Sequence, residues 1–282
     1  MDTSSEIPHL YYRKFQLAPG LEKFVKYAWI MKSFEAQSKP DLLIPDGYPE
    51  IIFVQKGGYR KEFIASGKGE IIIKRSCVIG MQTQSVLASR IDECGLLGLK
   101  LQPMGAYLLF GTKLKEILNE NRNLQSFGVE YLKELDLKLQ NCEEEEQIRD
   151  VLSHSLLQQT EQLKDRPKDD LPASVLSTIL RLNGKISIQL LAAEHGLGVR
   201  HFQRKFKDYF GISPKKFLNI IRFKHLYKAS ILKEKKAIDF LDYGYYDQMH
   251  FIKDFRKHLG ITPSKRIELN FLQMNQMAKI NS

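Results

Sequence analysis

The first third of the chain alternates short apolar runs with turn residues. The run Leu42-Leu43-Ile44 ends at Pro45-Asp46-Gly47, and the apolar residues 51–54 end at the glycine pair 57–58. Short runs separated by glycine and proline are typical of antiparallel strands. So many short runs favour a β-sandwich or jelly-roll barrel between about residues 10 and 110, rather than a doubly wound sheet. The remaining predicted strands are residues 63–65, 70–73, 76–80, 85–88 and 96–101.

After Tyr107 the apolar positions recur every three or four residues, which is the period of a helix. Four glutamates at 143–146 then open a further predicted helix, where acidic side chains complement the helix dipole. An apolar stripe along this helix needs a partner. The pattern leaves two partners open, namely the β domain of the same chain and the equivalent helix of a second subunit. The stripe consists of Ile148, Val151, Leu152, Leu156 and Leu163.

A polar segment at residues 166–170 contains a helix-breaking proline and is the predicted linker. The expected class is therefore an α+β multidomain protein. Its parts are a β-rich domain over residues 1–110, a helical connector over 111–166 and an all-α domain over 167–282. The last part begins with a helix from Leu171, which Asn183-Gly184 ends.

One segment of the all-α part occurs twice. The residues from His201 to Pro214 return as His250 to Pro263, at a constant offset of 49 positions. The histidine, both phenylalanines, the glycine, the isoleucine and the proline are identical in the two copies. Such regularity indicates that one supersecondary unit is used twice.

Each copy is typical of the second half of a helix-turn-helix unit. Phe202 and Phe206 stand four residues apart and so share one face of a helix, which leaves the basic residues on the other faces. Phe251 and Phe255 repeat this spacing. The expected first helices are residues 188–192 and Phe240-Leu241. The expected caps are Gly211 and Gly260 at the helix ends, Ser213 and Thr262 ahead of Pro214 and Pro263, and Asp247 ahead of the second recognition helix.

The net charge of +10 is unevenly distributed. Residues 1–166 carry 22 Lys and Arg against 23 Asp and Glu, whereas residues 167–282 carry 21 against 10. The whole excess belongs to the half that contains the repeat. This division indicates that one domain faces a polyanion and the other has a different task.

The cysteines and the first residues bear on the compartment. Cys77, Cys94 and Cys142 have neither the spacing of a zinc site nor the even count of a secreted disulfide scaffold, so free thiols are expected. The chain starts without the basic and then apolar layout of a signal peptide, and no apolar run approaches the roughly 20 residues of a membrane span. A cytoplasmic protein without a membrane partner is therefore expected.

Residues from about 172 to 268 resemble the DNA-binding domain of the AraC/XylS family of bacterial transcription regulators, in which a long helix joins two helix-turn-helix units. Gly198 departs from the family pattern, which often has a capping Ser or Thr there, so the first recognition helix should be less firmly capped. Leu226 and Leu241 replace a small residue. The matching positions are residues 201–207, 211–214, Arg222, 244–251, Phe255 and 260–263.

The first part of the chain is similar, over a shorter stretch, to the cupin-like sensor domain of one branch of this family. The similarity rests on the Pro45-Asp46-Gly47 turn, the Pro103-Met104-Gly105 step and the strand between them. It implies an N-terminal β-sandwich or cupin-like barrel, a helical connector and a C-terminal all-α domain with two helix-turn-helix units. It also implies that the first domain senses a small molecule or mediates dimerisation.

The residues that read bases are those left exposed once the core face is assigned. In the major groove an arginine binds guanine, and a glutamine binds adenine, with two hydrogen bonds each. The second unit offers one amide, apolar contact for thymine methyl groups and one cation, so it should read sequence less sharply. The expected base-reading residues are Arg200, Gln203 and Arg204 in the first unit and Gln248, Met249, Ile252 and Lys253 in the second.

Phosphate contacts are expected near helix starts, where backbone N–H groups and the helix dipole attract anions. Two units in successive grooves must lie about one helical turn, roughly 34 Å, apart. The connecting helix from Pro214 to about Lys233 is expected to set this distance, and the DNA to bend. The expected phosphate-binding residues are Lys207, Ser213, Lys215, Lys216, Arg256, Thr262, Ser264, Lys265 and Arg266.

A cupin-like barrel can also be a metal-dependent enzyme, whose site needs clustered histidine and carboxylate ligands. The chain has no histidine between His9 and His154. Asp46, Glu50 and residues 92–93 remain as candidate ligands, but Pro45-Asp46-Gly47 is ordinarily a turn and residues 92–93 are ordinarily a surface loop. A methyl-accepting cysteine would need an activated thiolate beside a cation or histidine, but Cys77 and Cys94 lie in apolar or β contexts and Cys142 stands beside four glutamates. No catalytic residue, metal ligand or cofactor is therefore expected, and His201 and His250 are expected to be buried hydrogen-bonding groups.

Two functions stay open at this point. The first is a sequence-specific DNA-binding transcription regulator that reads two successive major grooves. The second is a small-molecule binding or catalytic β domain whose basic tail only localises it to nucleic acid. The expected partner is a double-stranded DNA operator. A small-molecule effector, a second subunit in a homodimer and RNA polymerase stay open as further partners.

Overall fold

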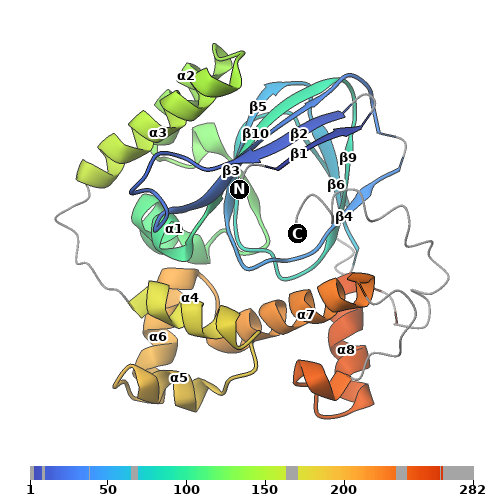
Figure 1. Cartoon of the computed structure of the whole chain (residues 1–282), viewed down its shortest axis with the longest axis vertical. Helices are drawn as coiled ribbons and strands as arrows, with labels where there is room; N and C mark the ends of the chain where they lie inside the picture. The colour runs from blue at the N-terminus through green and yellow to red at the C-terminus, as the bar shows by residue number, and fades with distance from the viewer. Residues whose placement is uncertain are drawn as a thin grey trace.

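The computed structural model describes residues 3–7, 10–37, 39–64, 69–162, 171–232, 240–260 and 262. The strands form one body with the first three helices, and the remaining helices lie beneath it (Figure 1). Two antiparallel sheets of seven and four strands make up the β domain. The larger sheet contains, in spatial order, β1 (Thr3–Ile7), β2 (Leu10–Phe15), β3 (Val25–Ser33), β10 (Cys94–Leu101), β5 (Glu50–Lys56), β8 (Cys77–Ile79) and β11 (Asn121–Asn123). The smaller one contains β4 (Asp41–Leu43), β9 (Val86–Arg90), β6 (Tyr59–Phe63) and β7 (Glu70–Ile73).

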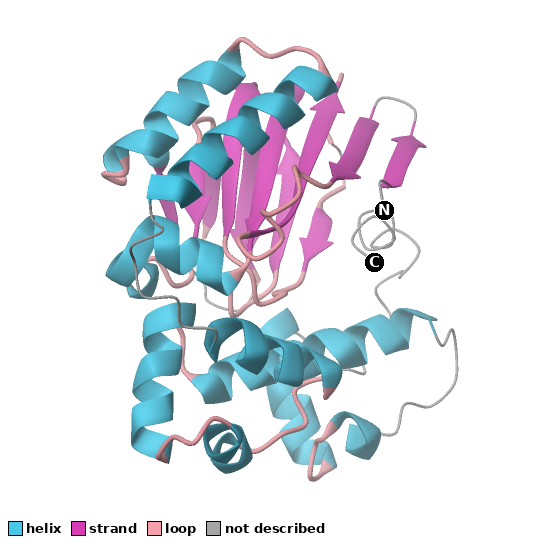
Figure 2. Ribbon diagram, turned by 60° about the vertical axis from the view of Figure 1, so that its left-hand side comes forward, coloured by secondary structure: helices cyan, strands magenta, loops and turns pink. Residues whose placement is uncertain are grey.

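The two sheets face each other across an apolar layer, as the expected β-sandwich requires. Tyr59 and Ile73 of the smaller sheet share one buried cluster with Trp29 and Ile52 of the larger sheet. The opposite face of the larger sheet is covered by helices (Figure 2). Because side chains alternate along a strand, β10 serves both layers, with Leu97 directed to the helices and Leu96 to the smaller sheet.

Most predicted strands are confirmed to within two residues of their observed bounds. The strand expected at 63–65 was placed too late, because β6 is built mainly from Tyr59-Arg60-Lys61-Glu62, whose charges hid its alternation. Strands β1 to β3 were not singled out, since β1 is mostly polar in sequence and basic residues interrupt the apolar residues of β2 and β3. The sheet also continues past residue 110, where the β domain was expected to end, because β11 pairs with β8.

Three helices cover the larger sheet, namely α1 (Pro103–Phe110), α2 (Glu130–Gln140) and α3 (Glu145–Gln162). The apolar stripe of α3 packs on its own β domain, since Ile148, Leu152 and Leu156 belong to the same buried cluster as Phe53. Two partners were left open for this stripe, and in the structure the β domain of the same chain covers it. Two short 3-10 helices, η1 (Gly111–Lys115) and η2 (Leu124–Ser126), connect these elements.

The helical body contains α4 (Leu171–Arg181), α5 (Ile188–Glu194), α6 (Val199–Phe210), α7 (Pro214–Leu232), η3 (Phe240–Tyr243) and α8 (Gln248–Leu259). The helix expected from Leu171 and the long connecting helix are confirmed. Phe240 and Leu241 lie in the short 3-10 helix η3 instead of an α-helix, and residues 233–239 and the predicted linker at 166–170 lie outside the described residues.

The three cysteines, Cys77, Cys94 and Cys142, are free thiols, as expected, and all three are buried. Among the described residues, no helix is both long enough and apolar enough to cross a bilayer.

Candidate nucleic-acid interface

The first recognition unit, α5 and α6, buries one face of α6 and exposes the other. Phe202, Phe206 and Phe210 pack with Phe217 of α7, and the rings of Phe206 and Phe210 are stacked with centroids 4.0 Å apart. The opposite face presents basic and amide side chains to solvent. Recognition helices of this kind need such a rigid apolar back, because a mobile helix cannot hold its side chains against base edges.

A groove of about 540 Å³ lies along the exposed face of α6. It brings together the three residues expected to read bases and three of those expected to bind phosphate. Arginine and lysine side chains that converge on one concave surface suit a polyanion. The lining residues are Ile188, Arg200, Gln203, Arg204, Lys207, Ser213, Pro214 and Lys215.

The ends of α6 follow the predicted chemistry. Gly198 occupies the N-cap position without a side-chain hydrogen bond, so the weak cap expected there is confirmed. Gly211 ends the helix in the left-handed region at φ 71°. The carbonyl of Ser213 then accepts the Phe217 N–H at 3.0 Å, and α7 begins at Pro214 with Lys215 and Lys216 exposed.

The second recognition unit, η3 and α8, is capped more firmly than the first. At the repeat position of Gly198 this unit has a carboxylate, since Asp247 Oδ1 accepts the His250 N–H at 2.7 Å. Gly260 ends α8 at φ 70°. Gln248, Met249, Lys253 and Arg256 are exposed, Ile252 and Thr262 are half-buried, and Ser264, Lys265 and Arg266 lie outside the described residues.

The connecting helix α7 holds the turn of the second unit. The guanidinium of Arg222 donates from Nη1 to the carbonyl of Gly244 at 3.0 Å and lies 6.0 Å from the ring of Tyr245. Arg222 also hydrogen-bonds Asn219 one turn earlier. Lys185, which follows the end of α4, donates to the carbonyl of Asp242 at 3.0 Å. The two units are therefore joined by side-chain contacts as well as by the helix itself.

The histidines correct one expectation. His201 is exposed and not buried, because its position on α6 points away from the face that carries Phe202. His250 is half-buried between Tyr245 and Tyr246. Among the histidines of the described residues, His258 is the buried one, and its ring stacks on Phe223 with centroids 4.3 Å apart. Its burial lowers the pKa of His258 to about 4, although the Asp254 carboxylate opposes this shift.

The β domain contacts the end of the first recognition helix. A Cβ atom on Gly211 would lie 2.8 Å from the carbonyl oxygen of Leu114, so the two backbones touch. Lys115 and Asp208 form an ion pair at the same place. The rings of Tyr107 and Tyr209 meet edge to face with centroids 4.6 Å apart. The last turn of α6 is therefore fixed against η1 and α1.

The β domain contacts the second recognition helix at the equivalent position of the repeat. A Cβ atom on Gly260 would lie 2.9 Å from the carbonyl oxygen of Ile64. The N–H of Ser85 donates to the carbonyl of His258 at 2.9 Å. Leu42 of β4 joins the buried cluster that contains Phe255. The connecting helix was expected to set the distance between the units, and the β domain is a second restraint on it.

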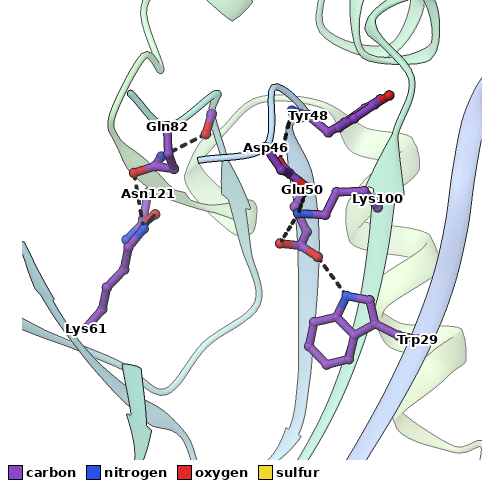
Figure 3. Close-up of polar contacts among 9 residues, drawn as sticks. Trp29, Asp46, Tyr48, Glu50, Lys61, Gln82, Lys100 and Asn121 are labelled. Atoms are coloured by element: carbon purple, nitrogen blue, oxygen red, sulfur yellow. Dashed lines mark hydrogen bonds and ion pairs between the residues drawn. The ribbon is translucent and has the colours of Figure 1, made fainter. Parts of the chain in front are cut away.

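A network of charged side chains lies at the edge of the sandwich that faces α7 (Figure 3). Lys100 Nζ lies 3.4 Å from Asp46 Oδ2 and 3.2 Å from Glu50 Oε2. The indole N–H of Trp29 donates to Glu50 Oε1 at 2.7 Å. Asp46 Oδ1 accepts the N–H of Tyr48 at 3.1 Å, which is the turn expected from Pro-Asp-Gly.

The pKa shifts in this network follow from burial and charge. Burial acts to raise the pKa of Asp46, but the positive charges of Lys100, Lys224 and Lys26 outweigh it and hold that pKa below its usual value. Burial likewise acts to lower the pKa of Lys100, and the carboxylates of Asp46 and Glu50 raise it well above its usual value. Asp46 and Lys100 are therefore both charged at neutral pH.

Three further lysines interact electrostatically with Asp46 and form, together with Lys100, what we call the lysine cluster, namely Lys14, Lys26 and Lys224. Burial lowers the pKa of Lys26 to about 7 and that of Lys14 to about 8, and the neighbouring lysines add to both shifts. Burial also lowers the pKa of Lys224 on α7. The Nζ atoms of Lys26 and Lys224 lie 3.7 and 5.9 Å from the centre of the Tyr48 ring.

Sequence reasoning missed this cluster. Asp46 was considered as a turn residue or a metal ligand and Glu50 as a metal ligand, and the lysines were not considered. One available signal was Lys100 between Leu99 and Leu101, because a lysine inside an apolar strand needs a partner when the strand is buried. A second buried lysine, Lys61 of β6, donates to Asn121 Oδ1 at 3.1 Å inside the sandwich (Figure 3). Among the described residues, no three His, Cys, Asp or Glu side chains are grouped to hold a metal ion.

Comparisons with known families match the two parts of the chain separately. Residues 191–267 match a family described as a helix-turn-helix domain. Residues 13–123 match a domain of unknown function, DUF6597, and this match ends at the last residue of β11. The helix-turn-helix match spans most of α5 and both recognition helices.

Three individual proteins are similar to parts of this chain or to most of it. The probable transcription factor PqrA of Proteus vulgaris is 33% identical over 94 residues, which are 32% of this chain and 75% of that protein. A structure of ToxT from Vibrio cholerae is 12% identical with a TM-score of 0.41 and covers 84% of this chain and 97% of its own. The structure of KdgF from Halomonas sp. is 10% identical with a TM-score of 0.26 and covers 35% of this chain and 86% of its own.

Proposed function

The chain belongs to the AraC/XylS family of DNA-binding transcription regulators, and from this premise we propose that its two recognition units read successive major grooves of one operator. The observation that carries the proposal is the groove on the first unit. There Arg200, Gln203 and Arg204 lie beside Lys207, Ser213 and Lys215. Base edges and the flanking phosphates can be bound together only where both kinds of residue share one surface.

The two kinds of residue have different tasks in this proposal. Arginine or glutamine on α6 forms paired hydrogen bonds with guanine or adenine and so carries sequence information. Lysines at the start of α7 bind phosphates of any sequence and fix the orientation of the protein. Gln248, Met249, Ile252 and Lys253 have the base-reading task on α8. Lys216, Arg256, Thr262, Ser264, Lys265 and Arg266 complete the phosphate set.

Replacing Arg204 by alanine should relax the preference for one base pair at a cost of about 1–3 kcal/mol, because a bidentate contact to a base edge is lost. Replacing Lys215 should weaken all sequences alike and lower the slope of log affinity against log salt by about 1. Both effects can be measured by fluorescence anisotropy on operator fragments selected from the host genome, at several salt concentrations.

Lys138 on α2 supplies the matched control, because it is an exposed lysine far from both recognition units in the sequence and on a different body. Lys138→Ala should leave affinity and salt slope unchanged. Equal losses on every sequence for the Arg204 and Lys215 variants would contradict the division of tasks. A specific operator should keep an affinity advantage on the order of a thousandfold over random competitor DNA. If an excess of random DNA instead displaces the protein from the operator, the result would favour a β domain whose basic tail only localises it to nucleic acid.

The lysine cluster supports a second part of the function, the binding of an organic anion as effector. The four lysines outnumber the two carboxylates Asp46 and Glu50, so the protonated cluster carries excess positive charge in a largely buried region. Lys14, Lys26 and Lys100 belong to the β domain, whereas Lys224 belongs to α7. An anion that binds all four would therefore neutralise the excess charge and connect the sensor domain to the helix between the recognition units.

Affinity for such an anion should fall as the pH rises from 7 to 9. The protonated lysines bind the anion, and the pKa values of about 7 for Lys26 and about 8 for Lys14 mean that the free protein loses these charges in that interval. Lys26→Met and Lys224→Met should each weaken binding roughly tenfold or more. Trp29 is the single tryptophan of the chain, so its fluorescence can follow titration with a panel of carboxylates, sulfonates and phosphates.

Lys138→Met is again the control and should not alter the titration. If the affinity for the anion is independent of pH, or if the Lys26 and Lys138 variants lose equal affinity, the anion binds outside the lysine cluster. A second subunit and RNA polymerase stay predictions of the family resemblance, and neither proposal depends on them.

A further inference from the structure

The second recognition unit presents apolar groups where the first presents hydrogen-bonding groups. At the repeat offset, Met249 stands in place of Arg200 and Ile252 in place of Gln203. We propose that Tyr246 is a further specificity-determining residue and that it forms, with Met249 and Ile252, a surface that reads thymine methyl groups. This inference rests on the proposed function, since it requires both units to contact one operator.

Tyr246 is the most exposed large apolar side chain in the described part of the chain, at 87%. It directly precedes Asp247, the N-cap of α8. Its counterpart in the first unit is Leu197, which is half-buried and packs against the first helical core. The exposed ring is therefore specific to the second unit and is not demanded by the fold that the two units share.

The ring of Tyr246 is held in place although it is exposed. It stacks on His250, with centroids 6.1 Å apart and an interplanar angle of 24°. His250 in turn meets the edge of Tyr245 at 5.2 Å. Tyr245 is buried, and its hydroxyl donates to Asp254 Oδ2 at 3.2 Å. A ring anchored to the core in this way loses little conformational freedom when it contacts a ligand.

The apolar surface lies where the second unit would meet base edges. Met249 is 59% exposed, and Ile252 stands three residues later on the same face of α8. Lys253 and Arg256 are exposed on the same helix and supply charge for the flanking phosphates. The thymine C5-methyl is the one apolar group that base pairs present in the major groove. An apolar reading surface flanked by cations is therefore complementary to thymine.

Deoxyuridine tests this inference, because it differs from thymidine only in lacking the C5-methyl group. In a selected operator, thymidines are replaced by deoxyuridine in one half-site at a time, and binding of the full chain is measured by anisotropy. The wild type should lose roughly fourfold in affinity for each contacted methyl group, and only in the half-site of the second unit. Tyr246→Ala should reduce this sensitivity, whereas Tyr246→Phe should keep it.

The first unit supplies the control that separates this inference from the proposed function. In the other half-site, 7-deazaguanine removes the N7 acceptor that an arginine binds. It should weaken the wild type and leave Arg204→Ala unaffected. A 7-deazaguanine effect without any deoxyuridine effect would overturn the inference and leave the proposed function standing. Absence of both effects would remove the proposed function as well.

A protein partner is the other occupant that an exposed ring can have. If Tyr246→Ala and Met249→Ala keep wild-type affinity for thymidine and deoxyuridine operators but lower transcription in vitro, the surface binds the transcription apparatus and the inference is wrong. Circular dichroism of both variants should match the wild type, because neither side chain is buried.

Discussion

Replacing Lys100 by methionine should lower the free energy of unfolding of the β domain by about 3 kcal/mol. The change leaves Asp46 and Glu50 without their shared cation, and all three side chains are largely shielded from solvent. Removal of one partner from such a pair costs about 3–5 kcal/mol. We expect the lower end, because Lys26 and Lys224 also act on Asp46 and the Trp29 indole still binds Glu50.

The difference in the free energy of unfolding between the wild type and Lys100→Met should shrink as the pH falls from 7 to 4. In the wild type the pKa of Asp46 is held low, so its stabilisation is present above the unfolded value of about 4 and is lost below it. In the variant, burial without the cation raises that pKa, so the penalty exists at neutral pH and disappears in acid. Denaturant unfolding followed by Trp29 fluorescence reports on this network directly.

Lys100→Arg is the matched control, because it keeps the charge next to both carboxylates and should recover most of the stability. A difference that stays constant between pH 7 and pH 4 would contradict the electrostatic explanation. It would assign the role of Lys100 to the packing of its methylene groups.

Replacing Gly211 by alanine should destabilise the first recognition unit by about 2–4 kcal/mol. The left-handed φ of 71° costs an alanine about 1 kcal/mol. The new methyl group would also lie 2.8 Å from the Leu114 carbonyl oxygen and 3.1 Å from its Cβ, so the β domain must move away. Overpacking of this kind typically costs about 1–3 kcal/mol more.

Gly196→Ala separates these two costs. Gly196 has a similar φ of 63°, but an added Cβ would meet no heavy atom of the described chain within 4 Å. Gly196→Ala should therefore lower the free energy of unfolding by only about 1 kcal/mol. Unfolding of both variants can be followed by circular dichroism for the helices and by Trp29 fluorescence for the β domain. Equal destabilisation in the two variants would show that the contact with Leu114 does not restrain α6.

The helical half of the fold could be predicted from sequence because its signals are local. The repeat, the paired phenylalanines and the capping residues Asp247, Gly211 and Gly260 each act within one turn of chain, and the structure confirms them. The helix α3 also followed from its period. The period could not predict which surface packs against α3, because an apolar stripe shows only that one face of the helix is buried.

The lysine cluster could not be predicted in this way, since its members come from β2, β3, β10 and α7. Only the packing of the two bodies brings Lys224 next to Asp46. The contacts of Gly211 and Gly260 with the β domain have the same origin. In the sequence both glycines are explained completely as helix ends, so nothing indicates their second role. The strands β1 to β3 were missed for a local reason, because β1 is mostly polar and basic residues interrupt the apolar positions of β2 and β3.

The two recognition helices are copies of one unit, but the elements that hold their ends are not copies of each other. Leu114 belongs to η1, which adjoins α1, whereas Ile64 follows the end of β6 in the smaller sheet. A displacement of η1 therefore acts first on the end of α6, and a displacement of the chain after β6 acts first on the end of α8. The two recognition helices are alike, but different parts of the β domain hold their ends. A rearrangement within the β domain therefore changes the tilt of one helix relative to the other instead of moving both together.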